Sequence, residues 1–323
     1  MSYRIIDLPH YVSESGYMQT LNAMVKRLAA LPETISVYQV GSISSPGISD
    51  LDMIVVFKDN QKVEQNFLGN LSTEEKYLFV HNLYGISERD FADVKRFTFF
   101  NNFTLLYGTD TRTNPFLSPE NTEVLKKQVA IEYLIRMCIT VYLQQSYRVL
   151  RVRDLLLHVK ALQYDCEFLG IHSGRLVEKI SEIIEWRKNW FSHTPSTKSI
   201  INWWNEFYKE FELFIKSLFE NHKFYLPGKT SYLITNNISV VPSKGTVRFS
   251  RKGFVLPVTL SFLGKRYFRI QNKLNQFSFE VPVTSDNIPS ILENKFEFEK
   301  KYFEYNRKFL PNFFTLTMNL HVH

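Results

Sequence analysis

The 323-residue sequence predicts a chain of three parts: an α/β N-terminal domain over residues 1–115, an α-helical bundle over 116–226 and a β-rich C-terminal domain with one helix over 227–323. Three observations predict this division. Helical and strand-like patterns alternate in the first part, apolar residues of the second recur with a helical period, and short strand-like runs separated by turn residues fill the third. The composition, with 44% hydrophobic residues, 12 Gly and 12 Pro, excludes a disordered or collagenous chain.

The N-terminal part opens with a helical pattern over residues 14–30. Short apolar runs bounded by turn residues follow it, as is typical of β-strands. These runs cover residues 35–40, 51–57, 77–86 and 103–107. We therefore expect helices and strands to form an α/β layer in this part of the chain.

From about residue 121 the apolar period becomes helical. The segment 153–169 carries an apolar stripe along one face, with Arg153 and Lys160 on the opposite side. Another helix is expected to begin after Pro195-Ser196, because a serine before an apolar periodic segment is a common helix N-cap.

The C-terminal part has five strand-like runs and one helix. The runs cover residues 232–241, 246–249, 255–262, 267–270 and 277–283, and the helix covers 288–309. From residue 223 onward there are 15 Lys and Arg against 6 Asp and Glu, in a chain whose net charge is +7. This surplus of basic residues has two explanations. It could form a surface that binds RNA or another acidic partner, or it could place charges on exposed strand edges and so prevent them from pairing with other strands.

The sequence also predicts the cellular compartment in which the protein lies. No stretch approaches the ~18 uncharged apolar residues of a membrane span, so we expect no membrane crossing. The N-terminal residues lack the basic and apolar segments of a secretion signal. The two cysteines, Cys138 and Cys166, fall in apolar helical positions and are expected to be reduced core residues. Together these features favour a cytoplasmic protein.

One segment has residues of the kinds that bind a metal ion and a phosphate group. Gly41-Ser42 ends a predicted strand, and a short polar loop leads from it to Asp50 and Asp52 at the head of the next strand. Residues two apart in a strand point to the same face, so the two carboxylates are expected to converge on one ion, and Mg²⁺ prefers such oxygen ligands. Gly41 allows a close approach to phosphate, and Ser42 offers a hydroxyl and an N–H. The alternative is an ordinary turn before a buried strand.

This order of strand, Gly-Ser, loop, Asp-x-Asp and apolar strand resembles the nucleotidyltransferase superfamily that includes DNA polymerase β, especially its small bacterial branch with the aminoglycoside nucleotidyltransferases. The resemblance covers about residues 15–110, roughly a third of the chain. It implies that Asp50 and Asp52 are catalytic metal ligands for Mg²⁺ and that Gly41 and Ser42 hold the β- and γ-phosphates of a nucleoside triphosphate, with ATP the first choice. It further implies transfer of a nucleotidyl group to a hydroxyl acceptor with release of pyrophosphate.

The sequence departs from this family at a third carboxylate, which usually comes from a neighbouring strand. The corresponding run offers Asn82, and an amide cannot take a proton. Asp90 and Asp93 follow shortly after, where they are also explained as residues of a helix first turn. The third position is therefore open among these three residues.

Two further expectations concern binding. In the resembling family a basic side chain from the helical domain reaches the phosphates, and Arg153 and Lys160 are the candidates; the alternative is a solvated helix face.

A different function is also compatible with the missing carboxylate. The chain would then be a catalytically reduced nucleotidyltransferase-fold module that binds nucleotide, with a basic domain for RNA or another acidic partner.

Overall fold

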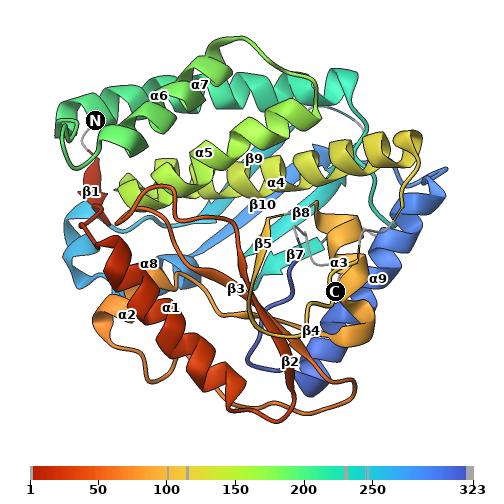
Figure 1. The fold of residues 1–323 in the computed structure, drawn as a ribbon. Coiled ribbons are helices and arrows are strands. Elements are labelled where there is room, and N and C mark those ends of the chain that lie inside the picture. The colour runs from red at the N-terminus through yellow and green to blue at the C-terminus, as the bar shows by residue number, and fades with distance from the viewer. Residues whose placement is uncertain are drawn as a thin grey trace. The chain divides into compact units, whose positions relative to one another are not determined.

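A computed structural model describes residues 3–99, 102–113, 116–228, 232–243, 245 and 247–317. The protein is a mixture of helices and strands with several separate sheets (Figure 1). It forms two compact units. We call residues 10–122 and 293–317 the N-terminal unit, and residues 3–9 and 123–292 the helical unit.

This division differs from the three parts that the sequence predicts. The boundary near residue 115 lies close to a unit boundary, whereas residue 226 lies inside the helical unit and residues 293–317 return to the N-terminal unit. Composition and periodicity change where secondary structure changes along the chain. They do not reveal which distant segments pack together, and for this reason the returning segment escapes a sequence-based division.

The N-terminal unit is built around a four-stranded sheet with the strand order β4-β3-β2-β5. Strand β2 is antiparallel to β3 and to β5, and β3 is parallel to β4. The elements of this unit are α1 (Glu14–Ala29), β2 (Thr34–Val40), β3 (Asp52–Phe57), α2 (Thr73–Leu78), β4 (Tyr84–Ser87), α3 (Phe91–Thr98), β5 (Phe103–Gly108) and most of α9 (Ser290–Phe309).

Both faces of this sheet are covered, because consecutive side chains of a strand point to opposite faces and all five residues after Asp52 in β3 are buried. On one face, Val37, Val55 and Phe57 join the apolar side of α1 in a single core. On the other face, the ring of Tyr38 stacks on that of Phe91 in α3 with 5.2 Å between centroids. The inner strands are therefore fixed on two sides, which gives their ends a rigid support.

One predicted strand of this unit is wrong. The run over residues 77–86 is divided between α2, which ends at Leu78, and β4, which begins at Tyr84. The side chain of Ser72 accepts a hydrogen bond from the N–H of Glu75, and the Glu75 carboxylate accepts one from the N–H of Ser72. This capping box starts a helix and outweighs the strand preference of the apolar residues that follow.

The helical unit contains four long helices, a two-stranded parallel pair and a second four-stranded sheet of order β7-β8-β10-β9. Helix α5 packs on α6, and α6 packs on α7 (Figure 1). Its elements are β1 (Arg4–Ile6), α4 (Pro119–Tyr147), β6 (Val149–Arg151), α5 (Val152–Phe168), α6 (Arg175–Asn189), α7 (Thr197–Asn221), β7 (Tyr232–Thr235), β8 (Ile238–Ser243), β9 (Arg248–Gly253), α8 (Lys265–Leu274) and β10 (Asn275–Pro282).

The C-terminal predictions are confirmed in part. The strand over 277–283 and the helix over 288–309 correspond to β10 and α9, and the helix after Ser196 is α7. Residues 255–262 instead lead into a 3₁₀ helix over Val258–Leu263, and 267–270 lie in α8. Short apolar runs fit a helix and a strand equally well, so neighbouring residues decide between them.

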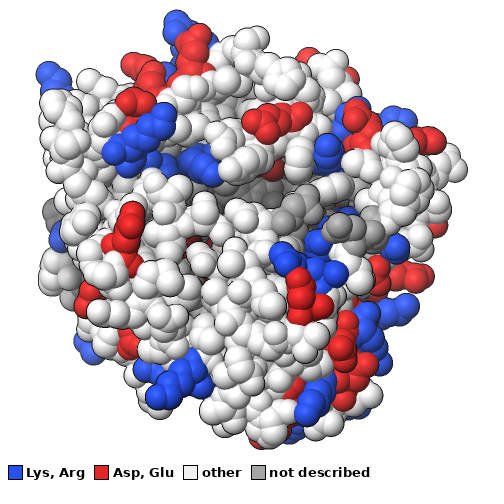
Figure 2. Space-filling model, in the orientation of Figure 1, with Lys and Arg blue, Asp and Glu red and all other residues white. Residues whose placement is uncertain are grey.

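The basic C-terminal region has charge at a sheet edge. Strand β9 is an edge strand, and its Arg248, Arg251 and Lys252 are exposed, as expected where charge opposes pairing with another sheet. On the face in Figure 2, Lys and Arg are interspersed with Asp and Glu. Cys138 and Cys166 are buried free thiols, as predicted. Among the described residues, no helix has the length and apolar character needed to span a membrane.

Candidate metal centre

Asp50, Asp52 and His81 form one cluster in the N-terminal unit. Each offers one possible ligand atom, and these atoms lie within 4.8 Å of one another. Strand β3 begins at Asp52, and β4 begins three residues after His81. Because β3 and β4 are parallel neighbours, the residues that precede them meet at the same edge of the sheet. The predicted convergence of Asp50 and Asp52 is therefore present.

His81 was not among the residues predicted for the site, yet its surroundings fix its imidazole closely. Its Nδ1 lies 2.7 Å from the carbonyl oxygen of Asn82, so Nδ1 carries a proton and donates it. The ring lies near the rings of Tyr84 and Phe314, with centroid separations of 4.9 and 6.0 Å. This backbone contact leaves Nε2 facing Oδ1 of Asp52 at 2.7 Å and the hydroxyl of Tyr84 at 3.2 Å.

The charge state of His81 depends on its acidic neighbours. Burial alone would lower the pKa of the imidazole, but the carboxylate of Asp52 raises it, and the carbonyl of Asn82 and the charge of Asp50 add to that effect. The net result is a pKa above the usual histidine value. Without a bound cation, the carboxylate of Asp52 therefore stabilises the protonated form of His81.

The donor set fits a divalent cation. Although Nε2 of His81 lies close to Oδ1 of Asp52, the two atoms lack hydrogen-bond alignment, and this buried oxygen has no hydrogen-bond donor among the described residues. Two carboxylates and one imidazole are common ligands of divalent metals. The contact from Nδ1 to a carbonyl is the kind that orients a metal-binding histidine. The residues thus offer oxygen and nitrogen donors, and one carboxylate oxygen among them is held by an ion pair that a bound cation would replace.

Gly41 and Ser42 lie beside this cluster. Val40 pairs with Asp52 across β2 and β3, so Gly41 is the next residue beyond that pair. Gly41 has a φ of +75°, and no atom lies within 4 Å of the position that a β-carbon would take. Ser42 is exposed. The corner therefore has both the backbone conformation that favours glycine and open space for a ligand.

The loop that leads to Asp50 is anchored by two tyrosines. The hydroxyl of Tyr17 donates to the carbonyl of Ser49 at 2.6 Å and accepts from the N–H of Gly47 at 3.0 Å. The hydroxyl of Tyr77 donates to the carbonyl of Gly47. No regular helix follows Gly41-Ser42, so the expected phosphate site lacks a helix end, and the N–H groups of Gly41 and Ser44 already donate to the carbonyls of Asn102 and Ser42.

Neither of the two acidic candidates for the third position, Asp90 and Asp93, belongs to the cluster. The carbonyl of Asn82 orients His81. Asp90 accepts a hydrogen bond from the hydroxyl of Ser87, and Asp93 forms an ion pair with Arg96 at 3.3 Å. These are the local helix-start roles that the sequence offered as the alternative. One feature of the sequence could have identified His81 as a site residue. It is a histidine that lies just before the strand that pairs in parallel with β3.

Arg153 and Lys160 belong to the helical unit, in α5. Arg153 was expected on a polar face but is buried, and its N–H donates to the carbonyl of Asp7 at 2.8 Å. Lys160 donates to the hydroxyl of Tyr164 at 2.7 Å. Their role in phosphate binding remains a prediction from the sequence.

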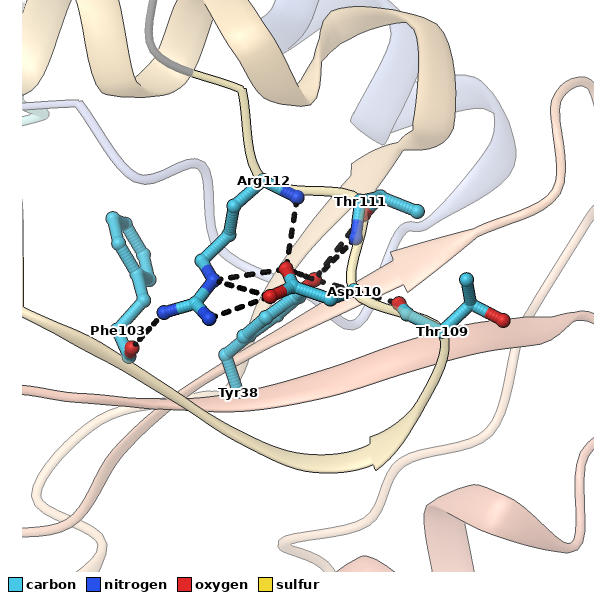
Figure 3. A network of polar contacts seen from close by, with 6 residues as sticks. All are labelled: Tyr38, Phe103, Thr109, Asp110, Thr111 and Arg112. Carbon is cyan, nitrogen blue, oxygen red and sulfur yellow. Dashed lines mark hydrogen bonds and ion pairs between the residues drawn. The ribbon is translucent and has the colours of Figure 1, made fainter.

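A polar network closes the end of β5, the strand next to β2 (Figure 3). Arg112 donates to both oxygens of Asp110 and to the carbonyl of Phe103, and the hydroxyl of Tyr38 accepts from the N–H of Thr111. The guanidinium holds the pKa of Asp110 well below its usual range. Phe103 pairs with Val40, so the network braces the strand end from which Gly41 and Ser42 extend.

No family model and no curated protein matches the chain.

Proposed function

We propose that the N-terminal unit is a Mg²⁺-dependent nucleotidyltransferase that moves a nucleotidyl group from a nucleoside triphosphate, ATP first among them, to a hydroxyl acceptor. One observation carries the proposal. Asp50, Asp52 and His81 converge within 4.8 Å beside an open glycine corner. A fold of the DNA polymerase β type is part of this proposal, supported by the order of Gly-Ser, loop and Asp-x-Asp around an antiparallel strand pair.

Each residue has a distinct role. Asp50 and Asp52 supply carboxylate oxygens to the cation, and His81 supplies Nε2 in the place where related enzymes have a third carboxylate. A bound divalent cation would orient the triphosphate and stabilise the charge that develops on it. Ser42 approaches the β- and γ-phosphates with its hydroxyl and N–H, and Gly41, whose own N–H donates to the carbonyl of Asn102 at 2.8 Å, provides the open space beside them. The oxygen of the acceptor hydroxyl attacks the α-phosphorus and its proton passes to solvent water, the bond between the α-phosphorus and the oxygen that bridges to the β-phosphate breaks, and pyrophosphate leaves.

Label transfer tests this proposal. The protein is incubated with ATP labelled at the α-phosphate, Mg²⁺ and a cell extract as the source of acceptor, and both acceptor label and released pyrophosphate are measured. We expect Asp50→Asn and Asp52→Asn each to lower transfer by a factor on the order of 100 or more, because each removes a ligand charge and almost no volume. Transfer at the native rate by the double variant would refute the assignment.

A matched control uses an exposed acidic residue of the same unit. Glu88 lies before α3 and is exposed, so Glu88→Gln changes the net charge as the aspartate variants do. We expect it to transfer label normally. Binding of Mn²⁺, measured by electron paramagnetic resonance, adds a readout that needs no acceptor and is expected to weaken in the aspartate variants alone.

A second function is favoured by one feature of the cluster. His81 pairs with Asp52, and among the described residues no third carboxylate joins them. The chain would then bind nucleotide without transferring it, and its basic C-terminal region would bind RNA or another acidic partner. Saturable binding of ATP with no release of pyrophosphate in the presence of any extract fraction would favour this function over transfer. RNA affinity that falls steeply with salt would support the partner.

A further inference from the structure

The helical unit contains a cavity of about 840 Å³ that the proposed transfer reaction does not use. Its walls come from β1, α4, β6, α5 and α8, and every lining residue belongs to this unit. Pockets for small organic molecules usually have volumes of about 300–1,000 Å³. The cavity is therefore large enough for such a molecule, and its lining indicates which chemistry it would take.

Gln144 of α4 has an unpaired donor in this cavity. The side chain is 7% exposed. Its Oε1 accepts a hydrogen bond from the N–H of Arg151 at 2.8 Å, and this contact fixes which end of the amide is which. The other end, Nε2, has no acceptor among the described residues. A buried donor without a partner is unfavourable, so an acceptor supplied by a ligand would satisfy it.

The lining of the cavity also has a small excess of positive charge, with three arginines against the two carboxylates of Asp7 and Asp154. Arg151 lies 3.5 Å from a carboxylate oxygen of Asp7 and 3.7 Å from one of Asp154, so its charge is compensated. Arg136 of α4 and Arg269 of α8 are exposed residues of the lining, and neither has an acidic partner within the part of the chain that the structure describes. Two guanidiniums on separate helices thus remain for an anion.

Apolar side chains form most of the remaining surface. Met137 and Leu143 of α4 and Phe268 of α8 belong to the lining together with the charged groups. An inorganic ion would leave this surface uncovered. We propose that the cavity binds a small organic anion, with a carboxylate, sulfonate or phosphate group at the guanidiniums of Arg136 and Arg269, a further hydrogen-bond acceptor at Nε2 of Gln144, which lies two turns along α4 from Arg136, and an apolar or aromatic body against Met137, Leu143 and Phe268.

Two fluorescent probes that differ in one group test this inference. The anion 8-anilinonaphthalene-1-sulfonate has an aromatic body and a sulfonate, whereas N-phenyl-1-naphthylamine has the same body without the charge. With the native full chain we expect saturable binding of one sulfonate probe per chain, at least about tenfold tighter than binding of the neutral probe, because charge-assisted contacts to two guanidiniums separate them.

Variants then locate the binding. The double variant Arg136→Gln and Arg269→Gln is expected to weaken the sulfonate probe about tenfold or more and to leave the neutral probe unchanged. Gln144→Glu keeps the acceptor for Arg151, replaces the free donor with a carboxylate and is expected to have the same effect. Arg266→Gln provides the control, because Arg266 is an exposed arginine of α8 outside the lining.

Thermal unfolding separates loss of binding from loss of fold. The proposal is supported if a variant unfolds at the same temperature as the native protein, binds the neutral probe with native affinity and binds the sulfonate probe more weakly. The proposal is overturned if the native protein binds neither probe, if it binds both equally, or if Arg266→Gln weakens the sulfonate probe as much as the double variant does. A variant that fails to fold is replaced by the single change Arg269→Gln, which is expected to weaken the sulfonate probe several-fold.

Discussion

The Nε2 of His81 lies 2.7 Å from the Oδ1 of Asp52, while the Nδ1 of the same ring is held by the carbonyl of Asn82. The histidine is therefore oriented by its backbone contact and does not depend on Asp52 for its position. With no cation bound, the raised pKa of His81 favours the imidazolium, which compensates the carboxylate. A cation at Asp50 and Asp52 competes with that proton, since an imidazole binds metal through an unprotonated nitrogen.

The first prediction concerns the choice of metal. His81→Asp replaces a nitrogen donor with an oxygen donor, and oxygen ligands suit Mg²⁺ whereas imidazole favours Mn²⁺ and later transition metals. We expect His81→Asp to raise the affinity for Mg²⁺ relative to Mn²⁺, and His81→Ala to weaken binding of Mn²⁺ about tenfold or more. Isothermal titration with each ion measures this. An unchanged Mn²⁺ affinity in His81→Ala would show that His81 is not a ligand.

The sequence predicted the central strands and the acidic pair because both signals are local. The segment from Gly41 to Phe57 contains the end of one strand, a turn and a buried strand, and both aspartates lie where that buried strand begins. Asp52 is the first residue of β3, and Asp50 lies two residues before it in the loop. Such information lies within a few residues and is readable without the fold.

His81 was missed because its role depends on pairing between strands. Only the parallel alignment of β3 with β4 brings a residue that precedes β4 to Asp52, and the predicted strand over 77–86 gave the wrong start for that alignment. The capping box of Ser72 and Glu75 was the local signal that would have corrected it. The segment 293–317, which returns to the N-terminal unit, had no comparable signal.

The second prediction concerns the glycine corner. Gly41→Ala forces a left-handed conformation on alanine and is expected to lower the free energy of unfolding by about 1–2 kcal/mol. Gly170 in the helical unit also has a positive φ, +71°, and open space around it, so Gly170→Ala is a matched control for strain. We expect both variants to lose similar stability in urea unfolding and only Gly41→Ala to raise the KM for ATP. An equal rise in KM in both would argue against a phosphate contact at Gly41.

The third prediction concerns the loop that carries Asp50. Tyr17→Phe leaves the N–H of Gly47 and the carbonyl of Ser49 without the hydroxyl, which is expected to lower stability by about 1–3 kcal/mol. Because the loop then loses its anchor, Mn²⁺ binding is also expected to weaken, about tenfold. In the control Tyr305→Phe, a hydroxyl bonded to the N–H of Asn60 is removed from the same unit. This control is expected to lose stability and bind Mn²⁺ normally, whereas weakening in both variants would point to a general loss of structure.

The last prediction concerns pH and a carboxyl of the helical unit. Burial raises the pKa of Asp165, in α5, well above its usual value. The folded state then binds a proton that the unfolded state releases, so the free energy of unfolding falls as pH rises from about 4 towards the folded pKa. Asp165→Asn removes this dependence. We expect the variant to unfold at a higher temperature than the native chain at pH 7, with a free energy of unfolding larger by an amount on the order of 1–3 kcal/mol, and to match the native chain more closely at pH 4.

Glu167 is an exposed neighbour, and Glu167→Gln is expected to leave the difference in stability between pH 4 and pH 7 unchanged. Native and Asp165→Asn proteins that lose stability equally between these pH values would show that Asp165 is ionised in the folded state.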